Sequence, residues 1–236
     1  MISLVGVLTT IFGTHYNLAE TESVVFGHGQ INDQSFHLLG VKESTDFGAQ
    51  QAFIMAERAL HILDSTSTDP VLLLVDVTGQ QLSMRDEWIG MHQYFSHLLM
   101  CLECLRTQGN PLISLIYNQA IGGAFIAYGL TADTILALPE AKVAVMWLDA
   151  MARITKLDVS ELEALSKTSP VFAPGVKNFH QLGGITSIVK PEKVAQALLN
   201  AVAKHNTTDL RAQDGFQRGG RQCAYPIIQK VLKQSL

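Results

Sequence analysis

Two adjacent glycines, Gly122-Gly123, occupy the position in this chain that is best suited to chemistry. An apolar run over 111–117, predicted as a buried strand, precedes them, and a small-residue helix follows. Glycines at such a turn let the backbone pass close to a ligand. The first N–H groups of a helix also lack partners and carry partial positive charge. The pair therefore predicts a site for a developing oxyanion. The alternative is that the glycines only allow the helix to pack tightly on the sheet.

Motifs for other chemistries are missing or incomplete. The chain has no Walker A loop and no G-x-S-x-G nucleophile elbow, and Gly27-His28-Gly29 lacks the third glycine of a dinucleotide fingerprint. His97, Cys101 and Cys104 share one helical face, but a metal site would need a fourth ligand and supporting hydrogen bonds. We therefore interpret the cysteines as core residues, with a metal site as the less favoured alternative.

The remaining polar candidates each have a structural explanation. Asp76 lies in an apolar strand, where a loop-anchoring role is favoured over catalysis. Asp149 is predicted to cap a helix rather than to act as an acid, and His28 has no identifiable acidic partner. Arg218 and Arg221 flank two glycines and could hold phosphates, but a solvated or subunit-interface role is favoured.

The candidate oxyanion hole is what remains once a nucleophile, a metal cage and a His–carboxylate pair are set aside. Such a hole stabilises the enolate of an acyl thioester. That enolate forms when a carboxyl group next to the carbonyl is lost or transferred, because electrons of the breaking C–C bond flow onto the carbonyl oxygen. One well-placed backbone N–H contributes roughly 3 kcal/mol at such an oxygen, so two donors can supply much of the acceleration.

The bulk properties of the 236 residues narrow the class of protein. Hydrophobic residues make up 47% and charged residues 16% of the chain, against about 25% charged in typical soluble domains. We therefore expect a partner to cover part of the surface. The net charge of −4 argues against non-specific nucleic-acid binding. No run reaches the roughly 18 apolar residues of a membrane span, and no basic region marks a signal peptide. The chain has three cysteines. Cys101 and Cys104 stand three apart, but they lie inside a predicted helix and without the second pair of a zinc ribbon, so reduced thiols in a cytoplasmic protein are favoured.

The apolar periodicity predicts an alternation of strands and helices. We expect strands over 23–31, 35–41, 71–77, 112–117, 134–138, 142–146 and 185–189. We expect helices over 48–64, 85–107, 148–155, 160–167, 178–182, 192–204 and 225–236. The apolar side of the first helix is predicted from Phe53, Ala56, Leu60 and Leu63, and Trp88 is predicted to begin that of the second.

Turn and cap signals complete this outline. Thr78-Gly79-Gln80 is predicted as a turn, Ser160 and Glu163 resemble a capping box, and Gly183 stands where a C-cap glycine belongs. Alternating strands and helices imply a parallel sheet with ligands at the carboxyl ends of its strands. Because Thr78-Gly79 and 121–123 both follow strands, we expect these two loops to converge on one site.

The chain resembles the crotonase-like carboxyltransferase superfamily. The resemblance runs from 71–79 through the long helix and 118–129 to Ala132-Asp133 and 141–146. Within the superfamily, Met146-Trp147-Leu148, 180–185 and the 218–221 tail are similar to the gamma-subunit family of biotin-independent malonate decarboxylases. The similarity extends over nearly the whole chain.

This resemblance implies a fold and a set of site residues. The fold is α/β, a crotonase-like (ClpP/crotonase) ββα superhelix that forms a single domain over 1–236, with a possible C-terminal helical extension over 209–236. Gly122 and Gly123 carry over as the backbone N–H donors of the oxyanion hole. Ala124 stands beside them, and we expect Thr78, Gly79, Ala124 and Met146 to line the substrate site; no metal is implied.

The resemblance also implies an activity and partners. With a homologous beta subunit, such a chain decarboxylates malonyl-S-acyl carrier protein to acetyl-S-acyl carrier protein and carbon dioxide. The carrier bears a phosphoribosyl-dephospho-coenzyme A arm, no cofactor is bound covalently to this chain, and an acyl-carrier transferase subunit completes a larger complex. Two alternatives stay open: one half of a biotin-dependent acyl-CoA carboxyltransferase, and a non-catalytic scaffolding subunit. The chain has neither a zinc ribbon nor a Met-Lys-Met biotin-acceptor motif. This absence fits a biotin-independent decarboxylase subunit, and it also fits one isolated half of an ordinary carboxyltransferase.

Overall fold

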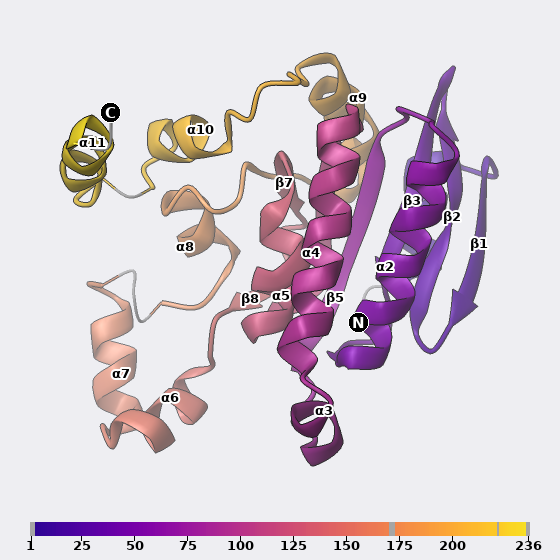
Figure 1. Ribbon diagram of the computed structural model, residues 1–236. Helices are drawn as coiled ribbons and strands as arrows, with labels where there is room; N and C mark the ends of the chain where they lie inside the picture. Colours follow the sequence, from indigo (N-terminus) through magenta and orange to yellow (C-terminus); the bar gives the residue numbers. More distant parts are fainter. Residues whose placement is uncertain (1–2, 170–172, 221, 235–236) are drawn as a thin grey trace.

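A computed structural model describes residues 3–169, 173–220 and 222–234. Its centre is one mixed sheet with the strand order β1-β2-β3-β5-β6-β7-β9 (Figure 1). The first three strands are antiparallel: β1 (Tyr16–Thr21), β2 (Val24–Ile31) and β3 (Gln34–Val41). From β3 onward the pairing is parallel, through β5 (Val71–Gln80), β6 (Leu112–Ile121), β7 (Thr134–Ala137) and β9 (Ser187–Ile188). The predicted parallel sheet is therefore confirmed for these strands.

Two short strands extend the carboxyl ends of the central pair. β4 (Thr45–Phe47) pairs with the end of β5, and β8 (Lys142–Ala144) pairs with the end of β6. β5 and β6 themselves stay paired up to Val77 and Ala120, with an irregularity in register just before. Both central strands thus continue beyond the body of the sheet and end next to each other.

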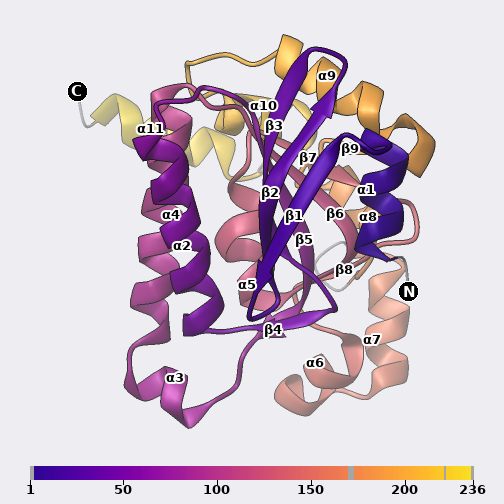
Figure 2. The ribbon, with the colours of Figure 1, turned by 90° about the vertical axis from the view of Figure 1, so that its right-hand side faces the viewer.

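Helices cover both faces of the sheet (Figure 2). On one face lie α2 (Ala49–Asp64), α4 (Met91–Gln108) and α5 (Gly122–Tyr128), and on the other lie α1 (Leu4–Phe12) and α9 (Val194–Ala203). β5 serves both cores, because Leu73 and Val75 belong to the first and Leu72 and Leu74 to the second. This alternation explains why the strand reads as a continuous apolar run.

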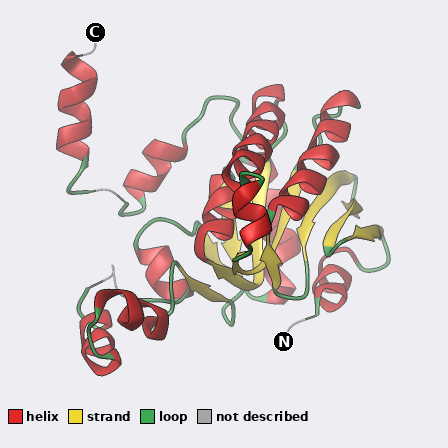
Figure 3. Ribbon diagram, turned by 60° about the horizontal axis from the view of Figure 1, so that its bottom comes forward, coloured by secondary structure: helices red, strands yellow, loops and turns green. Residues whose placement is uncertain are grey.

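The remaining helices gather mostly beside β7 and β8 (Figure 1). They are α6 (Leu148–Thr155), α7 (Val159–Ser166), α8 (Val176–Gln181), α10 (Arg211–Gln217) and α11 (Tyr225–Gln234), while α3 (Met84–Trp88) precedes α4 and two 3₁₀ turns occupy Gly129–Thr131 and Pro191–Lys193. α11 projects from the body of the molecule (Figure 3). No helix in the described ranges has the length and apolar character needed to cross a membrane.

Several predicted elements need correction. The 85–107 helix is two helices, because Gly90 adopts a left-handed conformation with φ of 76° between α3 and α4. Trp88 consequently lies outside the apolar stripe and is 80% exposed. Thr78-Gly79-Gln80 is not a turn but the last part of β5, since β4 pairs with it. The sequence prediction also missed α1, β1, β4 and α10.

The predicted apolar side of α2 is right for Ala56 and Leu63, which pack in the core, but wrong for its other two residues, and two predicted caps are also wrong. Phe53 and Leu60 are exposed, whereas small residues such as Ala52 and Ala59 face the core and let α2 lie close to α4. Asp149 lies in the first turn of α6, whose N-cap is Trp147. Asp158, rather than Ser160, is the N-cap of α7, so Ser160 and Glu163 do not form the expected capping box. Gly183, by contrast, follows α8 with φ of 77°, as a C-cap glycine should.

Candidate functional site

The double glycine lies where β6 passes into α5. Ile121 is still extended, with φ of −118° and ψ of 140°, and Gly122 then turns with φ of 64°. This left-handed conformation favours glycine over residues that carry a Cβ atom. A Cβ atom on Gly122 would lie 3.5 Å from Cα of Gly79 and 3.7 Å from the carbonyl oxygen of Val145. The predicted convergence of the 78–79 and 121–123 segments is therefore confirmed.

The Gly123 amide is paired with a side chain that sequence reasoning missed. Its N–H donates to Oε1 of Gln80 over 3.0 Å. Gln80 is the last residue of β5 and is exposed, so this bond lies at the surface where the two strands end. The side-chain carbonyl of Gln80 stands where an acyl carbonyl or enolate oxygen would accept the same hydrogen bond. The sequence signal for Gln80 was only its place directly after Thr78-Gly79.

The other four predicted site residues differ in how far they are exposed to solvent. Thr78 donates its hydroxyl to the Asp46 carboxylate and to the Ser44 carbonyl, so it is tied to the β4 segment. Gly79, with φ of 139°, has open space where a Cβ atom would be. Met146 is half-buried just beyond β8. Ala124, in the first turn of α5, is completely buried in the core, so it presents no surface to a ligand, and its predicted role at the substrate site stays a prediction.

Asp76 holds the carboxyl ends of the strands together. The side chain is 1% exposed and accepts the Ser44 N–H at 2.8 Å, the Asn118 side-chain amide at 3.0 Å and the Gln119 N–H at 3.2 Å. The Ser44 hydroxyl adds a fourth bond at 3.2 Å. These four bonds tie the β4 segment and the end of β6 to the same carboxylate of β5. The predicted loop-anchoring role of Asp76 is confirmed.

Two tyrosines near this network also have structural roles. The Tyr117 hydroxyl donates to the Val41 carbonyl over 3.1 Å, and the Tyr128 hydroxyl donates to the Leu74 carbonyl over 3.3 Å. Burial, with a smaller effect from the Asp76 charge, raises the pKa of both phenols far above the usual value near 10. Both groups therefore stay neutral and act as fixed donors to the backbone.

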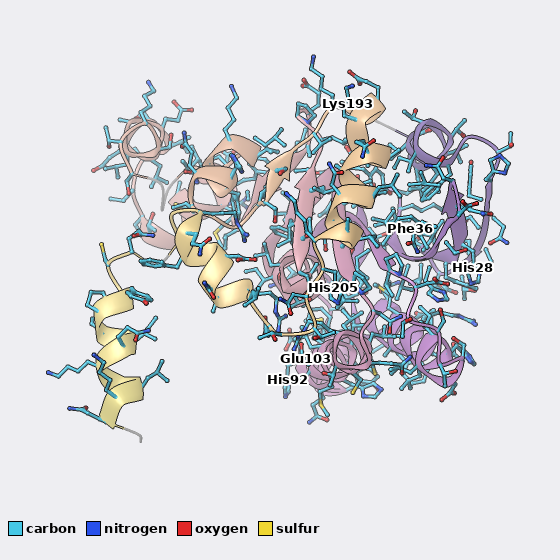
Figure 4. The ribbon with its side chains drawn as sticks, turned by 90° about the horizontal axis from the view of Figure 1, so that it is seen from above. His28, Phe36, His92, Glu103, Lys193 and His205 are labelled. Carbon is cyan, nitrogen blue, oxygen red and sulfur yellow. The ribbon has the colours of Figure 1, made fainter. Side chains whose placement is uncertain are left out.

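The cysteine and histidine candidates do not form a metal site. Cys101 is buried, its Sγ lies 3.8 Å from Nε2 of His97, and burial raises the pKa of its thiol. Cys104 is exposed, so only Cys101 fits the core interpretation. The residues that the structure describes contain no cluster of three or more metal-ligating side chains. His28 lies at the edge of the molecule (Figure 4). The centroids of its ring and of the His37 ring are 5.0 Å apart.

Of the two arginines considered for phosphate binding, the structure describes only Arg218. Arg218 donates from Nε and from one terminal nitrogen to the carbonyl oxygen of Gly183, over 3.3 and 3.2 Å. This contact joins the segment after α10 to the turn after α8, which gives Arg218 a structural role. Arg221 lies outside the described residues, and phosphate binding by either residue stays a prediction.

Comparisons with known proteins agree with this fold. A family model described as malonate decarboxylase gamma subunit matches residues 42–235. The malonyl-S-ACP:biotin-protein carboxyltransferase MADD of Malonomonas rubra is 30% identical over 242 residues, which is 89% of this chain and 83% of the relative.

Solved structures of two Pseudomonas assemblies are also similar. One chain of a malonate decarboxylase hetero-tetramer in complex with coenzyme A matches with a TM-score of 0.80 and 23% identity, over 100% of both chains. A chain of the MdcD-MdcE hetero-dimer matches with a TM-score of 0.77 and 23% identity, over 97% of both chains. The predicted crotonase-like fold is confirmed. Together with the family match over 42–235, these relationships show that the chain belongs to the malonate decarboxylase gamma subunit family.

Proposed function

We propose that this chain, paired with a homologous beta subunit, decarboxylates a malonyl group held as a thioester on an acyl carrier protein. The products are the acetyl thioester and carbon dioxide. The observation that carries the proposal is the Gly123 N–H, which faces an sp² oxygen, that of Gln80, at the surface where β5 and β6 end. The M. rubra relative acts on malonyl-S-ACP, which supports the same substrate class here.

The backbone donors act on the electrons of the breaking bond. As the bond between the carboxylate carbon and the α-carbon breaks, its electron pair forms the enolate and negative charge develops on the thioester oxygen. The N–H groups of Gly122 and Gly123 stabilise that charge, and each such donor contributes roughly 3 kcal/mol to the transition state. Gly79, Thr78 and Met146 form the surrounding wall of the site, and Ala124 supports the turn from the core.

The α-carbon of the enolate must then accept a proton. The carboxylates of Asp76 and Asp46 are engaged with the donors of Ser44, Asn118, Gln119 and Thr78. We therefore assign the proton donor to the partner subunit or to a water molecule at the shared site. This division makes the chain one half of an active site.

The proposed assembly also includes the prosthetic arm of the carrier protein, the subunit that loads the carrier, and a location in the cytoplasm. The thioester hangs from a phosphoribosyl-dephospho-coenzyme A arm on the carrier protein, and a separate transferase subunit loads it. The complex is cytoplasmic and includes the beta–gamma pair. The coenzyme A complex of the Pseudomonas hetero-tetramer supports an arm of this type, because both arms share the pantetheine thiol.

A second candidate function is transfer of the carboxyl group to a biotin-carrying protein. The M. rubra relative, named a malonyl-S-ACP:biotin-protein carboxyltransferase, favours it. The same N–H donors would serve that reaction, because the malonyl thioester again passes through an enolate. The two functions differ in the fate of the carboxyl group, which becomes either free carbon dioxide or carboxybiotin.

The test uses the co-purified beta–gamma pair and malonyl-loaded carrier protein with a ¹⁴C-labelled carboxyl group. Decarboxylation predicts release of labelled carbon dioxide that avidin does not inhibit, whereas carboxyl transfer predicts label on an added biotin protein and inhibition by avidin. Gly123→Pro removes the amide donor, and Gly123→Ala retains it. We expect the proline variant to lose about 100-fold or more in kcat and the alanine variant to retain most activity.

The scaffolding alternative predicts a different result from the same variants. If a correctly folded and assembled Gly123→Pro complex reacts at the wild-type rate, the catalytic role of this turn is wrong. Circular dichroism and gel filtration of each variant complex provide the check on folding and assembly.

A further inference from the structure

Two histidines face each other across the antiparallel strands β2 and β3. His28 and His37 are directly opposite in the register of the two strands, and the centroids of their rings are 5.0 Å apart. His28 is exposed, whereas His37 is only 8% exposed. His37 points to the same face of the sheet as Leu39 and Val41, which pack in the core with α2. Two imidazole rings are therefore held close together, one of them in the interior.

The loop before β5 contacts the buried ring. Nε2 of His37 and the Ser67 hydroxyl form a hydrogen bond of 3.1 Å, and the Ser67 oxygen also accepts the Asp69 N–H at 3.1 Å. The side chain of Asn110, which is completely buried, donates to the carbonyls of Ser67 and Asp69, over 2.8 Å in each case. The 65–69 loop is thus fixed on His37 at the amino end of β5, the end of the sheet opposite the double glycine.

A proton on His37 is unfavourable while the loop is closed. A charged imidazole has two N–H groups that need acceptors, and a charge removed from water costs free energy. Burial, and then the nearby positive charge of His28, lower the pKa of the His37 imidazole, while the Asp69 carboxylate acts in the opposite direction. The closed loop therefore favours the neutral ring.

The helix on the same face carries other charged groups. In α2 these are Glu57, Arg58, His61 and Asp64. Arg58 lies over the ring of Phe26, 4.1 Å from its centroid, and pairs with Glu57 over 3.5 Å. His61 and Asp64 are exposed. Among the described residues, the charges that shift the pKa of His37 are those of His28 and Asp69.

We propose that His37 makes the 65–69 loop an acid-sensitive clasp on the paired strands β2 and β3. Opening of the loop lets water reach the ring, so the open state holds a proton more readily and acid shifts the equilibrium toward opening. The sign follows from the lowered pKa of His37. Stability is complete above the unfolded histidine pKa of about 6.5, and it is lost as the pH falls below that value, until the native ring itself is protonated. The clasp lies away from the double glycine and does not depend on the proposed catalysis.

The first test measures the protons that the purified chain takes up when it unfolds. Urea midpoints and slopes are recorded from about pH 7.5 to about pH 5, and the change in the free energy of unfolding with pH gives the uptake. For His37→Gln, whose neutral side chain can still bond to Ser67, we expect the uptake below about pH 6.5 to fall by up to one proton. His28→Gln removes only the opposing charge and should lower the uptake by less. His92→Gln, at an exposed position of α4 away from this pair (Figure 4), is the control and should retain the wild-type uptake.

The second test follows the loop itself in the wild-type chain, so it does not depend on how well a variant folds. We expect the amide hydrogens of 65–69 to exchange at least about threefold faster at pH 5 than at pH 7, after correction for intrinsic rates. The amides of β6 are the internal control and should show no comparable acceleration. In His37→Gln the acceleration in the loop should be lost.

Three results would overturn the inference. The first is the same proton uptake on unfolding for His37→Gln and the wild type. The second is exchange of the wild-type loop at the same corrected rate at both pH values. The third is an acceleration in acid that His37→Gln retains in full, which would assign the effect to another group.

Discussion

The side-chain carbonyl of Gln80 and the backbone N–H of Gly123 form a hydrogen bond of 3.0 Å between the ends of the two central strands. The two residues are far apart in sequence, and they meet because β5 and β6 are parallel neighbours that both continue past the body of the sheet. In this arrangement the chain supplies an internal oxygen to the amide that we assign to the substrate. A thioester must displace Gln80 before it can use that donor.

Removing the Gln80 side chain should therefore favour substrate binding. We expect Gln80→Ala in the beta–gamma complex to lower KM for the malonyl carrier by about 3- to 10-fold, the value of one neutral hydrogen bond, with kcat within twofold. Gln80→Glu should raise KM instead, because a carboxylate bonds the amide more strongly and repels the malonate charge. Steady-state kinetics with both variants measures this split. An unchanged KM for both would mean that Gln80 does not compete with the substrate.

The anchoring role of Asp76 predicts a loss of stability. Asp76→Asn replaces an acceptor of four hydrogen bonds with a group that presents a donor to other donors. We expect the free energy of unfolding to fall by about 2–3 kcal/mol, measured from the urea midpoint and slope. Asp33→Asn, at an exposed turn, is the control and should change the value by at most about 0.5 kcal/mol. Equal stability of the two variants would contradict the anchoring role.

The central strands and the double glycine could be predicted, because strands buried on both faces are continuous apolar runs and Gly122-Gly123 follows one of them. The final residues of β5 could not. Thr78 to Gln80 are polar or small, and they are extended only because the three-residue β4 pairs with them. The break at Gly90 was also hidden, since one glycine inside an apolar periodicity is compatible with a continuous helix. Gln80 escaped notice because its role depends on a contact between distant segments.

The C-terminal segment should loosen in acid. Glu103 and Asp209 face Arg106 and Arg211. The hydrogen bond from Arg106 lowers the pKa of the Glu103 carboxyl group, and the hydrogen bond from Arg211 lowers the pKa of the Asp209 carboxyl group. Carboxyl groups with a lower pKa in the folded state stabilise it above the unfolded pKa of about 4. That stability is lost as the pH falls through the lowered values.

Hydrogen exchange can follow this change in α10. We expect faster exchange over Arg211–Gln217 at pH 3 than at pH 6, after correction for intrinsic rates, and a smaller difference at high salt because these groups are partly exposed. Arg211 also donates to the Thr131 carbonyl at 2.7 Å, so Arg211→Gln should loosen α10 at both pH values and remove most of the pH dependence. A wild-type chain with the same corrected rates at both pH values would argue against the ion pairs as the tether.

A second tether depends on a glycine rather than on charge. Gly183 has φ of 77°, and a Cβ atom there would lie 2.7 Å from the carbonyl oxygen of Gly215 and 2.9 Å from the amide nitrogen of Gly220. Gly183→Ala therefore combines a strained backbone with a clash against backbone that cannot easily move. It should also disturb the Gly183 carbonyl that Arg218 binds.

We expect Gly183→Ala to lower the free energy of unfolding by about 2 kcal/mol and to make trypsin cleave at Arg218 earlier than in the wild type. Gly184→Ala is the matched control, because a Cβ atom at Gly184 would be 3.4 Å from its nearest neighbour, the Phe179 carbonyl oxygen. It should leave both measurements close to the wild-type values. If the two variants were cleaved at the same rate, the close approach of Gly183 to the 215–220 backbone would not be what holds the C-terminal segment, and Arg218 would have to hold it alone.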